Sequence, residues 1–205
     1  MMKAGYSTII FDLSEVLISG LLGVENTLSL LLNISADSIL QALADDSLSQ
    51  LCLGNISEEI YLNQIKTNHH WDIGIEDLKT AIRRNFHHKI PEMEYIISQL
   101  SQNYMLILHS DHGREWIHYI LKIHPFLQNF QHCVFSFQIG KTKDDPGAFA
   151  DLLSLINTSA QECVFIDDNP HNVQSAETVG IRSIHFQSAD ILVRQLADSG
   201  IVLEV

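Results

Sequence analysis

Carboxylates follow two apolar stretches of the chain, in an arrangement suited to holding a divalent cation. Asp167 and Asp168 come directly after the apolar run Cys163–Ile166. Asp12 comes directly after a second apolar run, residues 7–11. Adjacent carboxylates at the end of a buried strand are costly unless positive charge neutralises them. Oxygen ligands of this kind suit magnesium, so the pattern predicts a metal site built for phosphate chemistry.

A serine at a third strand end extends the candidate site. Ser110 lies just past the apolar run 104–108, as Asp12 and Asp167 lie at or just past the ends of their own runs. In open parallel sheets, ligands bind beyond the carboxyl ends of the strands, at the topological switch point. If the first strand is central and the other two flank it, all three side chains converge on one pocket.

Apolar runs alternate with amphipathic segments from about residue 91 onward. Strict alternation of this kind indicates a parallel sheet with helices on both faces, the α/β class with a Rossmann-like sheet. Proline at the first helical position and glycine just past the last one mark the clearest helix, which begins at Pro170 and ends before Gly180. The expected strands are 7–12, 104–108, 133–137, 163–166 and 182–186, and the expected helices are 91–103, 116–121, 149–156, 170–179 and 190–198.

The segment 18–88 contains no convincing strand and is expected to form a small α-helical bundle. Its apolar residues recur at helical spacing, and Ser35 and Ser57 are plausible N-caps. The sequence therefore predicts an α/β core formed by 1–17 and 89–205, with 18–88 as a helical cap. Because the insert leaves the sheet at the edge where the carboxylates lie, it would roof the pocket.

Composition excludes several classes of protein. The 205 residues include 12 basic and 25 acidic side chains, a formal charge of −13, which argues against binding to nucleic acid or to anionic membranes. No apolar run reaches membrane-spanning length, and Asp12 and Glu15 interrupt the N-terminal apolar stretch, which argues against a signal peptide. The scattered Cys52, Cys133 and Cys163 are typical of reduced core residues in a cytoplasmic protein.

Four short motifs in a fixed order resemble those of the haloacid dehalogenase-like (HAD) hydrolases, with the phosphatase branch as the best match. The resemblance covers essentially the whole chain, and the position of the insert is similar to that of the family's helical cap. The motif residues are Asp12 after Phe11, Ser110 at the end of a later strand, Lys143 between Gly140 and Asp145-Pro146, and the pair Asp167-Asp168 followed by Asn172, Ala176 and Gly180.

The resemblance implies a magnesium-dependent phosphatase of a small soluble phosphomonoester. Asp12 would attack phosphorus and form an aspartyl-phosphate. Magnesium would be held by Asp12, Asp167 and the backbone carbonyl of Ser14, with Asp168 close by or acting through water. The substrate phosphate would lie against Ser110, Asp111 and Lys143. Ser110 would donate a hydrogen bond to a phosphoryl oxygen, and Lys143 would neutralise charge between Asp12 and the phosphate.

The motifs also depart from the family pattern at four positions. Ser14 stands where the phosphatases usually have the aspartate that protonates the leaving oxygen and then activates water, and a hydroxyl cannot do this near neutral pH. Loss of a general acid typically costs about 10²–10⁴ in rate. The dehalogenase branch has a tyrosine at this position. The other departures are Glu15 for the usual glycine, Asp111 for a common asparagine, and Asp144 for the proline that usually follows the lysine.

The departures leave a second class of function open. The chain could be a weakly active or non-catalytic member that binds a phosphorylated ligand or a protein partner. Retention of Asp12, Lys143 and the aspartate pair favours the enzyme, because a scaffold has no need of them. Phosphotransferase or mutase activity is a third option. It would depend even more on the proton transfers that the missing aspartate performs.

Simpler interpretations also apply to single residues. Asp167-Asp168 could cap a helix, and Lys143, beside Lys141, could be surface charge. The residues that flank Ser110 are candidates for substrate contact or for replacing the missing acid, and equally for packing: His109, His112 and Arg114. The pairs His69-His70 and His87-His88 suggest a metal site, but no carboxylate or cysteine has matching spacing.

Overall fold

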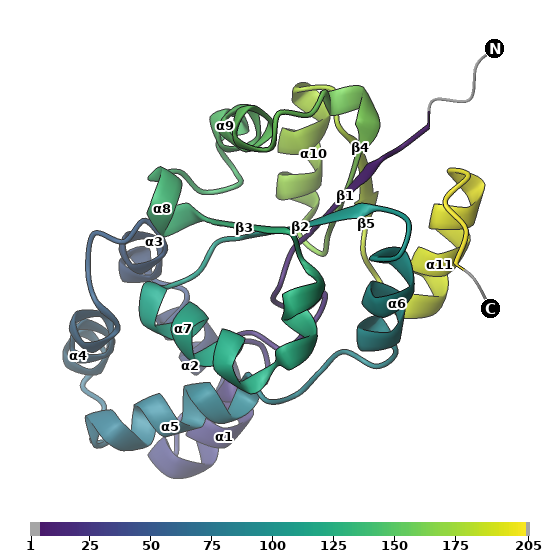
Figure 1. Ribbon diagram of the computed structural model, residues 1–205. Helices are drawn as coiled ribbons and strands as arrows, with labels where there is room; N and C mark the ends of the chain where they lie inside the picture. Colours follow the sequence, from purple (N-terminus) through teal and green to yellow (C-terminus); the bar gives the residue numbers. More distant parts are fainter. Residues whose placement is uncertain (1–4, 204–205) are drawn as a thin grey trace.

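The computed structural model describes residues 5–203 and has a five-stranded parallel sheet at its centre (Figure 1). The strand order is β3-β2-β1-β4-β5, and every neighbouring pair is parallel. The predicted α/β class with a Rossmann-like sheet is confirmed. The strands are β1 (Thr8–Phe11), β2 (Met105–Ser110), β3 (His132–Phe135), β4 (Cys163–Asp167) and β5 (Arg182–His185).

Helices cover both faces of the sheet, and alternation along the strands explains which helix packs where (Figure 1). Ile10 packs in an apolar cluster with α9 and α10, whereas Ile9 and Phe11 face a larger cluster that includes α6, α7 and α11. The helices of this part of the chain are α6 (Met93–Leu100), α7 (Arg114–Ile123), α8 (Ser136–Ile139), α9 (Pro146–Ile156), α10 (Pro170–Thr178) and α11 (Ala189–Asp198), with short 3₁₀ segments η1 (Pro125–Asn129) and η2 (Ala160–Glu162).

The central place of β1 brings the predicted strand ends together. Phe11 is in register with Leu108 of β2 on one side and with Ile166 of β4 on the other. The Asp12 N–H continues the pairing and donates to the Ile166 carbonyl at 2.9 Å. Asp12 therefore lies between the ends of its two neighbouring strands, as the sequence pattern predicts.

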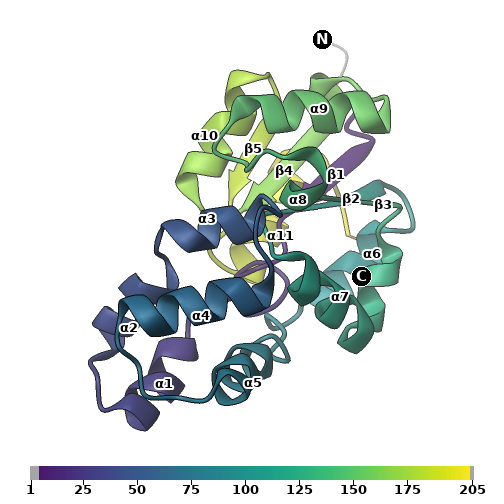
Figure 2. The same cartoon turned by 90° about the vertical axis from the view of Figure 1, so that its left-hand side faces the viewer.

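Between β1 and α6 the chain forms five helices, which gather at one end of the sheet (Figure 2). Ser35 and Ser57 cap two of them, since their hydroxyls accept the N–H groups of Ser38 and Ile60. The third helix was not expected, because it is short and carries only a weak apolar stripe. The helices are α1 (Val24–Leu32), α2 (Ala36–Leu43), α3 (Asp46–Cys52), α4 (Glu58–Asn68) and α5 (Ile75–Asn85).

The two connections between this helical insert and the sheet run side by side. Ile18 forms an antiparallel bridge with Lys89. The Ser19 N–H donates to the His88 carbonyl at 2.8 Å, and the Ile90 N–H donates to the Leu17 carbonyl at 2.9 Å. This paired crossing coincides with the expected boundaries at 17/18 and 88/89, and the division into two domains stays a prediction.

The insert is held tightly against α7. A Cβ on Gly113, which precedes α7, would lie 2.9 Å from Leu51 Cγ, so glycine allows α3 to approach closely. The buried Glu58 of α4 accepts a hydrogen bond from Trp116 Nε1 at 2.9 Å. Arg83 of α5 binds the same carboxylate through Nη2 at 2.6 Å and through Nε at 3.2 Å. These contacts join α4, α5 and α7.

Several predicted boundaries are wrong by two or three residues. The strand expected over 133–137 ends at Phe135, and Ser136–Ile139 forms the short helix α8. The Ser136 hydroxyl donates to the Cys52 carbonyl at 2.6 Å and accepts the His112 N–H at 3.2 Å, which favours the turn over a continued strand. The helix expected to open at Pro91 begins at Met93.

Cys52 and Cys163 are buried, Cys133 is half-buried, and all three carry free thiols. Within residues 5–203, no helix combines the length and the apolar character that crossing a membrane requires.

Candidate active site

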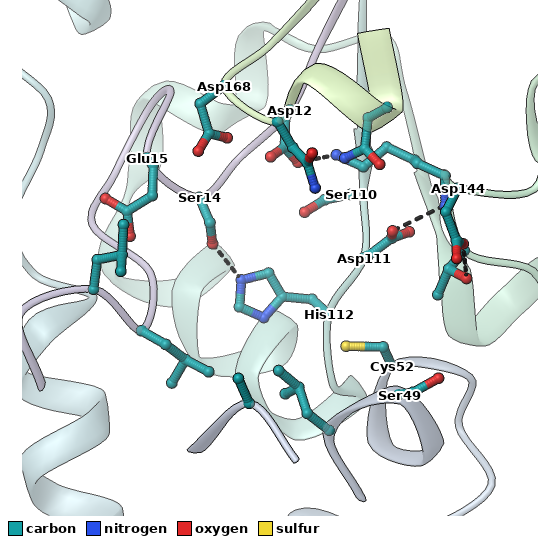
Figure 3. A pocket seen from close by; sticks show the side chains of 18 of the residues that line it. Asp12, Ser14, Glu15, Ser49, Cys52, Ser110, Asp111, His112, Asp144 and Asp168 are labelled. Carbon is teal, nitrogen blue, oxygen red and sulfur yellow. Dashed lines mark hydrogen bonds and ion pairs between the residues drawn. The ribbon is translucent and has the colours of Figure 1, made fainter. Parts of the chain in front are cut away.

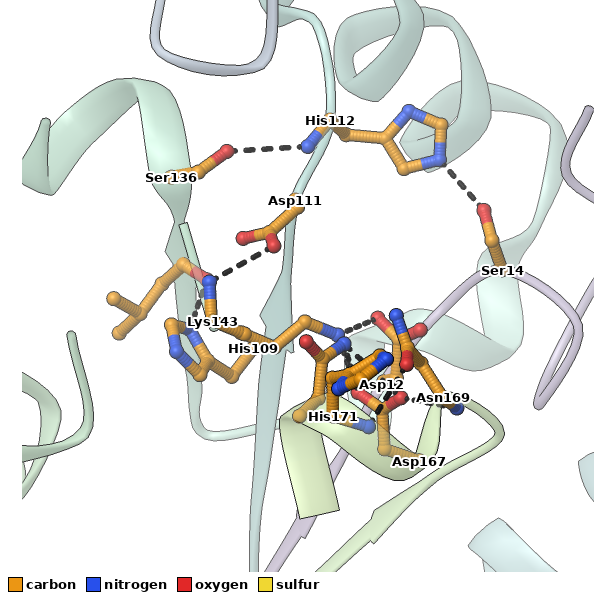
Figure 4. A network of polar contacts seen from close by, with 12 residues as sticks. Asp12, Ser14, His109, Asp111, His112, Ser136, Lys143, Asp167, Asn169 and His171 are labelled. Atoms are coloured by element: carbon orange, nitrogen blue, oxygen red, sulfur yellow. Dashed lines mark hydrogen bonds and ion pairs between the residues drawn. The ribbon is translucent and has the colours of Figure 1, made fainter. Parts of the chain in front are cut away.

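The carboxyl ends of β1 and β4 form a compact cluster of three carboxylates and one lysine. The nearest side-chain oxygens of Asp12, Asp167 and Asp168 lie within 4.8 Å of one another. Lys143 Nζ lies 2.6 Å from Asp12 Oδ1 and 2.6 Å from Asp167 Oδ2 (Figure 4). Asp12 is 6% exposed, and Lys143 and Asp167 are 1% and 0% exposed. At this burial, each charge depends on its neighbours for stability.

The charge balance of this cluster suits a divalent cation. Burial, followed by repulsion from Asp12 and Asp167, raises the pKa of Asp168 to about 7. Burial also raises the pKa of Asp167, against the opposing charge of Lys143. Three carboxylates therefore share one ammonium group in a buried site. Since all the donors are oxygens, the residues present fit magnesium well.

Lys143 is a positively charged member of the site rather than a surface residue. Burial alone would lower its pKa, but the charges of Asp12, Asp167 and Asp111 raise it well above the ordinary value. Lys141, by contrast, pairs with Asp151 at 2.7 Å on the surface. Of the two lysines, Lys143 is therefore the one that lies buried against the carboxylates.

Asp111 holds the loop that carries Lys143. Its Oδ2 accepts the Lys143 backbone N–H at 2.9 Å. Burial, and repulsion by Asp12 and Asp167, raise the pKa of Asp111 to about 6, although Lys143 opposes the shift. Asp111, which stands where asparagine is common, therefore anchors the backbone of Lys143. The contact of Asp111 with phosphate stays a prediction.

Ser110 presents an unused hydroxyl at the centre of the cluster. It ends β2, is 1% exposed, and its Oγ has no hydrogen-bond partner among residues 5–203. A buried hydroxyl without a partner is uncommon. A phosphoryl oxygen placed between Ser110 and Lys143 would accept its hydrogen bond.

Ser14, the residue at the position of the missing acid, is hydrogen-bonded to His112. Ser14 Oγ and His112 Nε2 are 2.8 Å apart (Figure 4). Burial, with a further contribution from Lys143, lowers the pKa of His112 to about 3, so the imidazole is neutral. A Cβ on Gly20 would lie 2.7 Å from Ser14 Oγ, so the returning chain packs against Ser14 and restricts its side chain.

The backbone conformation at Glu15 explains why glycine is usual at this position. Its φ of 59° lies in the left-handed region, which costs a non-glycine residue about 1–2 kcal/mol. The Glu15 carboxylate accepts the Gly20 N–H at 2.7 Å. This bond offsets part of the cost and fixes the loop that carries Ser14.

A cavity of about 710 Å³ opens in front of the cluster (Figure 3). Its inner wall comes from the strand ends and includes Asp12, Ser110 and Lys143. Its outer wall comes from the insert, as the sequence pattern predicts: Leu21, Leu22, Ala44, Asp45, Asp46, Leu48, Ser49 and Cys52. The insert therefore shapes the part of the cavity that lies beyond the carboxylates.

The other candidate residues lie elsewhere or pack. His109 is buried beside Phe149 and donates from Nδ1 to the Val134 carbonyl at 3.1 Å. Arg114 is exposed and lies 4.5 Å from the centre of the Phe137 ring. Within residues 5–203, Asp12, Asp167 and Asp168 form the one group of at least three potential metal ligands, so neither histidine pair of the insert assembles a metal site.

Sequence reasoning missed the specific partner of Ser14. His112 was one of several candidates near Ser110, and 98 residues separate it from Ser14 in the chain. No spacing rule connects two residues so far apart. The only signal was its place two residues after the strand-end serine, on the edge where the carboxylates lie.

The region 9–186 matches the family model described as haloacid dehalogenase-like hydrolase. A curated relative from Arabidopsis thaliana, named flavin mononucleotide hydrolase 1, is 28% identical over 138 residues. That match covers 65% of this chain and 54% of the relative, so the chain spans about half the length of that relative.

Solved structures share the fold over nearly the full chain. A HAD-like family hydrolase from Porphyromonas gingivalis has a TM-score of 0.76 at 22% identity, covering 94% of this chain and 97% of that one. A HAD-family enzyme from Bacteroides thetaiotaomicron, solved in complex with magnesium and inorganic phosphate, has a TM-score of 0.74 at 19% identity, covering 90% and 96%. At these identities the likeness concerns the fold.

Proposed function

The chain belongs to the haloacid dehalogenase-like hydrolases, and from this premise we propose that it is a magnesium-dependent phosphatase of a small soluble phosphomonoester. The observation that carries the proposal is the buried contact of Lys143 Nζ with Asp12 Oδ1 and Asp167 Oδ2, both at 2.6 Å. A lysine held between a candidate nucleophile and a candidate metal ligand is suited to neutralising a transferring phosphoryl group.

The proposed reaction passes through an aspartyl-phosphate. An oxygen of Asp12 attacks phosphorus, and the ester oxygen leaves as an alkoxide with the electrons of the broken P–O bond and takes a proton from water. Lys143 neutralises charge between Asp12 and the phosphate, and Ser110 donates its free hydroxyl to a phosphoryl oxygen. Water then attacks phosphorus, which releases inorganic phosphate and regenerates Asp12.

Asp12, Asp167, Asp168 and the Ser14 backbone carbonyl are the groups that would hold magnesium. When bound, the ion supplies positive charge to the phosphate oxygens. Asn169 N–H donates to Asp167 Oδ1 at 2.8 Å, and Asn172 Nδ2 donates to both Asp167 oxygens at 3.2 Å. These bonds fix the carboxylate in one orientation. Hydrogen bonds from neighbouring groups commonly orient metal ligands in this way.

A second candidate function is binding of a phosphorylated ligand or protein partner with little or no turnover. The observation in its favour is Ser14, whose hydroxyl is bonded to a neutral histidine and cannot protonate a leaving group as a carboxylic acid does. Retention of the whole charged cluster favours the phosphatase. Three neighbouring carboxylates cost stability, and clusters of this kind are typical of functional sites.

A screen of phosphate esters tests the proposal. We expect magnesium-dependent release of phosphate from at least one ester, with p-nitrophenyl phosphate and flavin mononucleotide among those assayed, the latter because of the named Arabidopsis relative. Esters with good leaving groups should be hydrolysed fastest, because they need no general acid. Removal of the metal with EDTA should abolish release. The hypothesis fails if no ester is hydrolysed faster with magnesium than with EDTA.

A further inference from the structure

The charges on the cavity wall indicate the chemical class of the substrate. Resting on the proposed function, we propose that the substrate is a phosphomonoester whose alcohol half carries a positively charged amino group and no second anion. The inference concerns the part of the cavity beyond the phosphate position, which is formed jointly by the insert and the strand-end loops.

The wall of the cavity is strongly acidic. Among the described residues that line it, seven carry carboxyl groups and one carries an ammonium group. Figure 3 shows carboxylates on opposite sides of the opening, with Glu15 and Asp168 across from Asp111 and Asp144. The acidic lining residues are Asp12, Glu15, Asp45, Asp46, Asp111, Asp144 and Asp168.

The single positively charged residue among the described lining residues, Lys143, already has ion-pair partners. Lys143 Nζ is ion-paired with Asp12 and Asp167 and is 1% exposed, and the proposed reaction assigns it to the phosphate. His112, which also lines the cavity, is hydrogen-bonded to Ser14 through Nε2. A carboxylate or second phosphate on the alcohol half would thus face several like charges with no cation of the described lining available to it.

The lining also offers carboxylate oxygens as hydrogen-bond acceptors. Asp111 Oδ2 accepts the Lys143 N–H, whereas Asp111 Oδ1 has no hydrogen-bond partner among residues 5–203. On the insert, the Asp45 Oδ1 atom caps α3 by accepting the Ser47 N–H at 2.9 Å, and its Oδ2 lies 3.9 Å from His69 Nε2. Asp46 follows in the same helical turn and is exposed. An ammonium group is a donor that suits such acceptors.

The body of the substrate need not be small or polar. The lining of the cavity of about 710 Å³ also includes Leu21, Leu22 and Leu48 of the insert. This combination of leucines and carboxylates fits an apolar body that ends in an amine. The wall therefore offers both apolar contact and negative charge to the alcohol half of the substrate.

Three benzyl phosphates that differ only in the para substituent test the charge preference. The substituents are aminomethyl, hydroxymethyl and carboxyl, so size and leaving group are closely matched. We expect kcat/KM to fall in that order, with at least about tenfold between the first and the last, and the ratio to shrink at high salt because the charges are partly exposed. An equal rate for all three, or a preference for the carboxyl ester, overturns the charge inference.

Variants of the insert locate the preference. Asp45→Asn/Asp46→Asn should lower the ratio of aminomethyl to hydroxymethyl ester by about two- to fivefold per carboxylate, and asparagine keeps the helix cap at position 45. Asp37→Asn is the matched control, since Asp37 lies in the first turn of α2 and does not line the cavity. An unchanged ratio in the double variant contradicts the assignment to these residues.

Calorimetric titration of Asp12→Asn with the same three esters separates this inference from the proposed function. If no ester is hydrolysed, the phosphatase proposal fails, but the order of binding affinities still reports on the charge of the cavity. Tightest binding of the aminomethyl ester supports the inference, and equal or reversed affinities refute it whatever the outcome of the activity assay.

Discussion

Replacing Asp12 by asparagine is expected to lower kcat for every hydrolysed ester by about 10⁴-fold or more, because an amide cannot form the covalent intermediate. The substitution keeps the shape of the side chain, and Lys143 keeps its contact with Asp167 at 2.6 Å. The protein should therefore stay folded while turnover is lost. The measurement is phosphate release at saturating substrate and magnesium.

The control for this substitution is thermal unfolding of the same preparation. Asp12 is 6% exposed and shares its site with two other carboxylates, so removal of one negative charge should not lower the melting temperature. A variant that melts like the wild type and retains activity within tenfold of it would show that Asp12 is not the nucleophile.

Replacing Ser14 by aspartate is expected to speed the phosphorylation step of esters with poor leaving groups by about 10²–10⁴, the usual contribution of a general acid. Esters with good leaving groups need no proton at this step, so their phosphorylation should change little. Aspartate should also activate water for the second step, so steady-state turnover should rise for all esters. Rapid-quench measurement of both steps separates the two effects.

Ser14→Asn is the matched control, since asparagine has the size of aspartate but no carboxyl group to act as a general acid or base. Both side chains must fit beside Gly20, whose added Cβ would lie 2.7 Å from Ser14 Oγ, and beside His112. Acceleration by aspartate and not by asparagine assigns the effect to the proton. An equal acceleration of good and poor leaving groups in the first step would argue that the missing acid does not limit the wild type.

The lack of a general acid and base at Ser14 should also be visible in the kinetics of the wild type. With Ser14 in place, a good leaving group departs readily, whereas hydrolysis of the aspartyl-phosphate lacks a base. The covalent intermediate should then accumulate. This consequence makes the intermediate unusually accessible to direct detection.

The fold and the inner wall of the site were predictable from sequence because their signals are local or strictly ordered. Apolar runs mark strands buried on both faces, and a residue at the end of such a run lies at the edge where ligands bind. Asp12, Ser110 and Asp167 each meet this condition, so their convergence required only that β1 be central. Lys143 came from motif spacing, and the structure places it on two of these carboxylates.

Contacts between loops and helices that lie far apart in the chain could not be predicted in this way. The bond between Ser14 and His112 depends on how β1 and β2 pair and on how the loops after them turn. The early end of β3 depends on Ser136, which donates to the Cys52 carbonyl of the insert. Such contacts arise from tertiary packing, which local propensity does not encode.

The central claim is that Asp12 carries the phosphoryl group during turnover. The most direct test is mass spectrometry of peptides from wild-type enzyme quenched in acid a few milliseconds after mixing with p-nitrophenyl phosphate and magnesium. The account predicts a phosphate adduct on the peptide that contains Asp12, absent from Asp12→Asn and from samples treated with EDTA. Steady hydrolysis without an adduct, or an adduct on another residue, would contradict it.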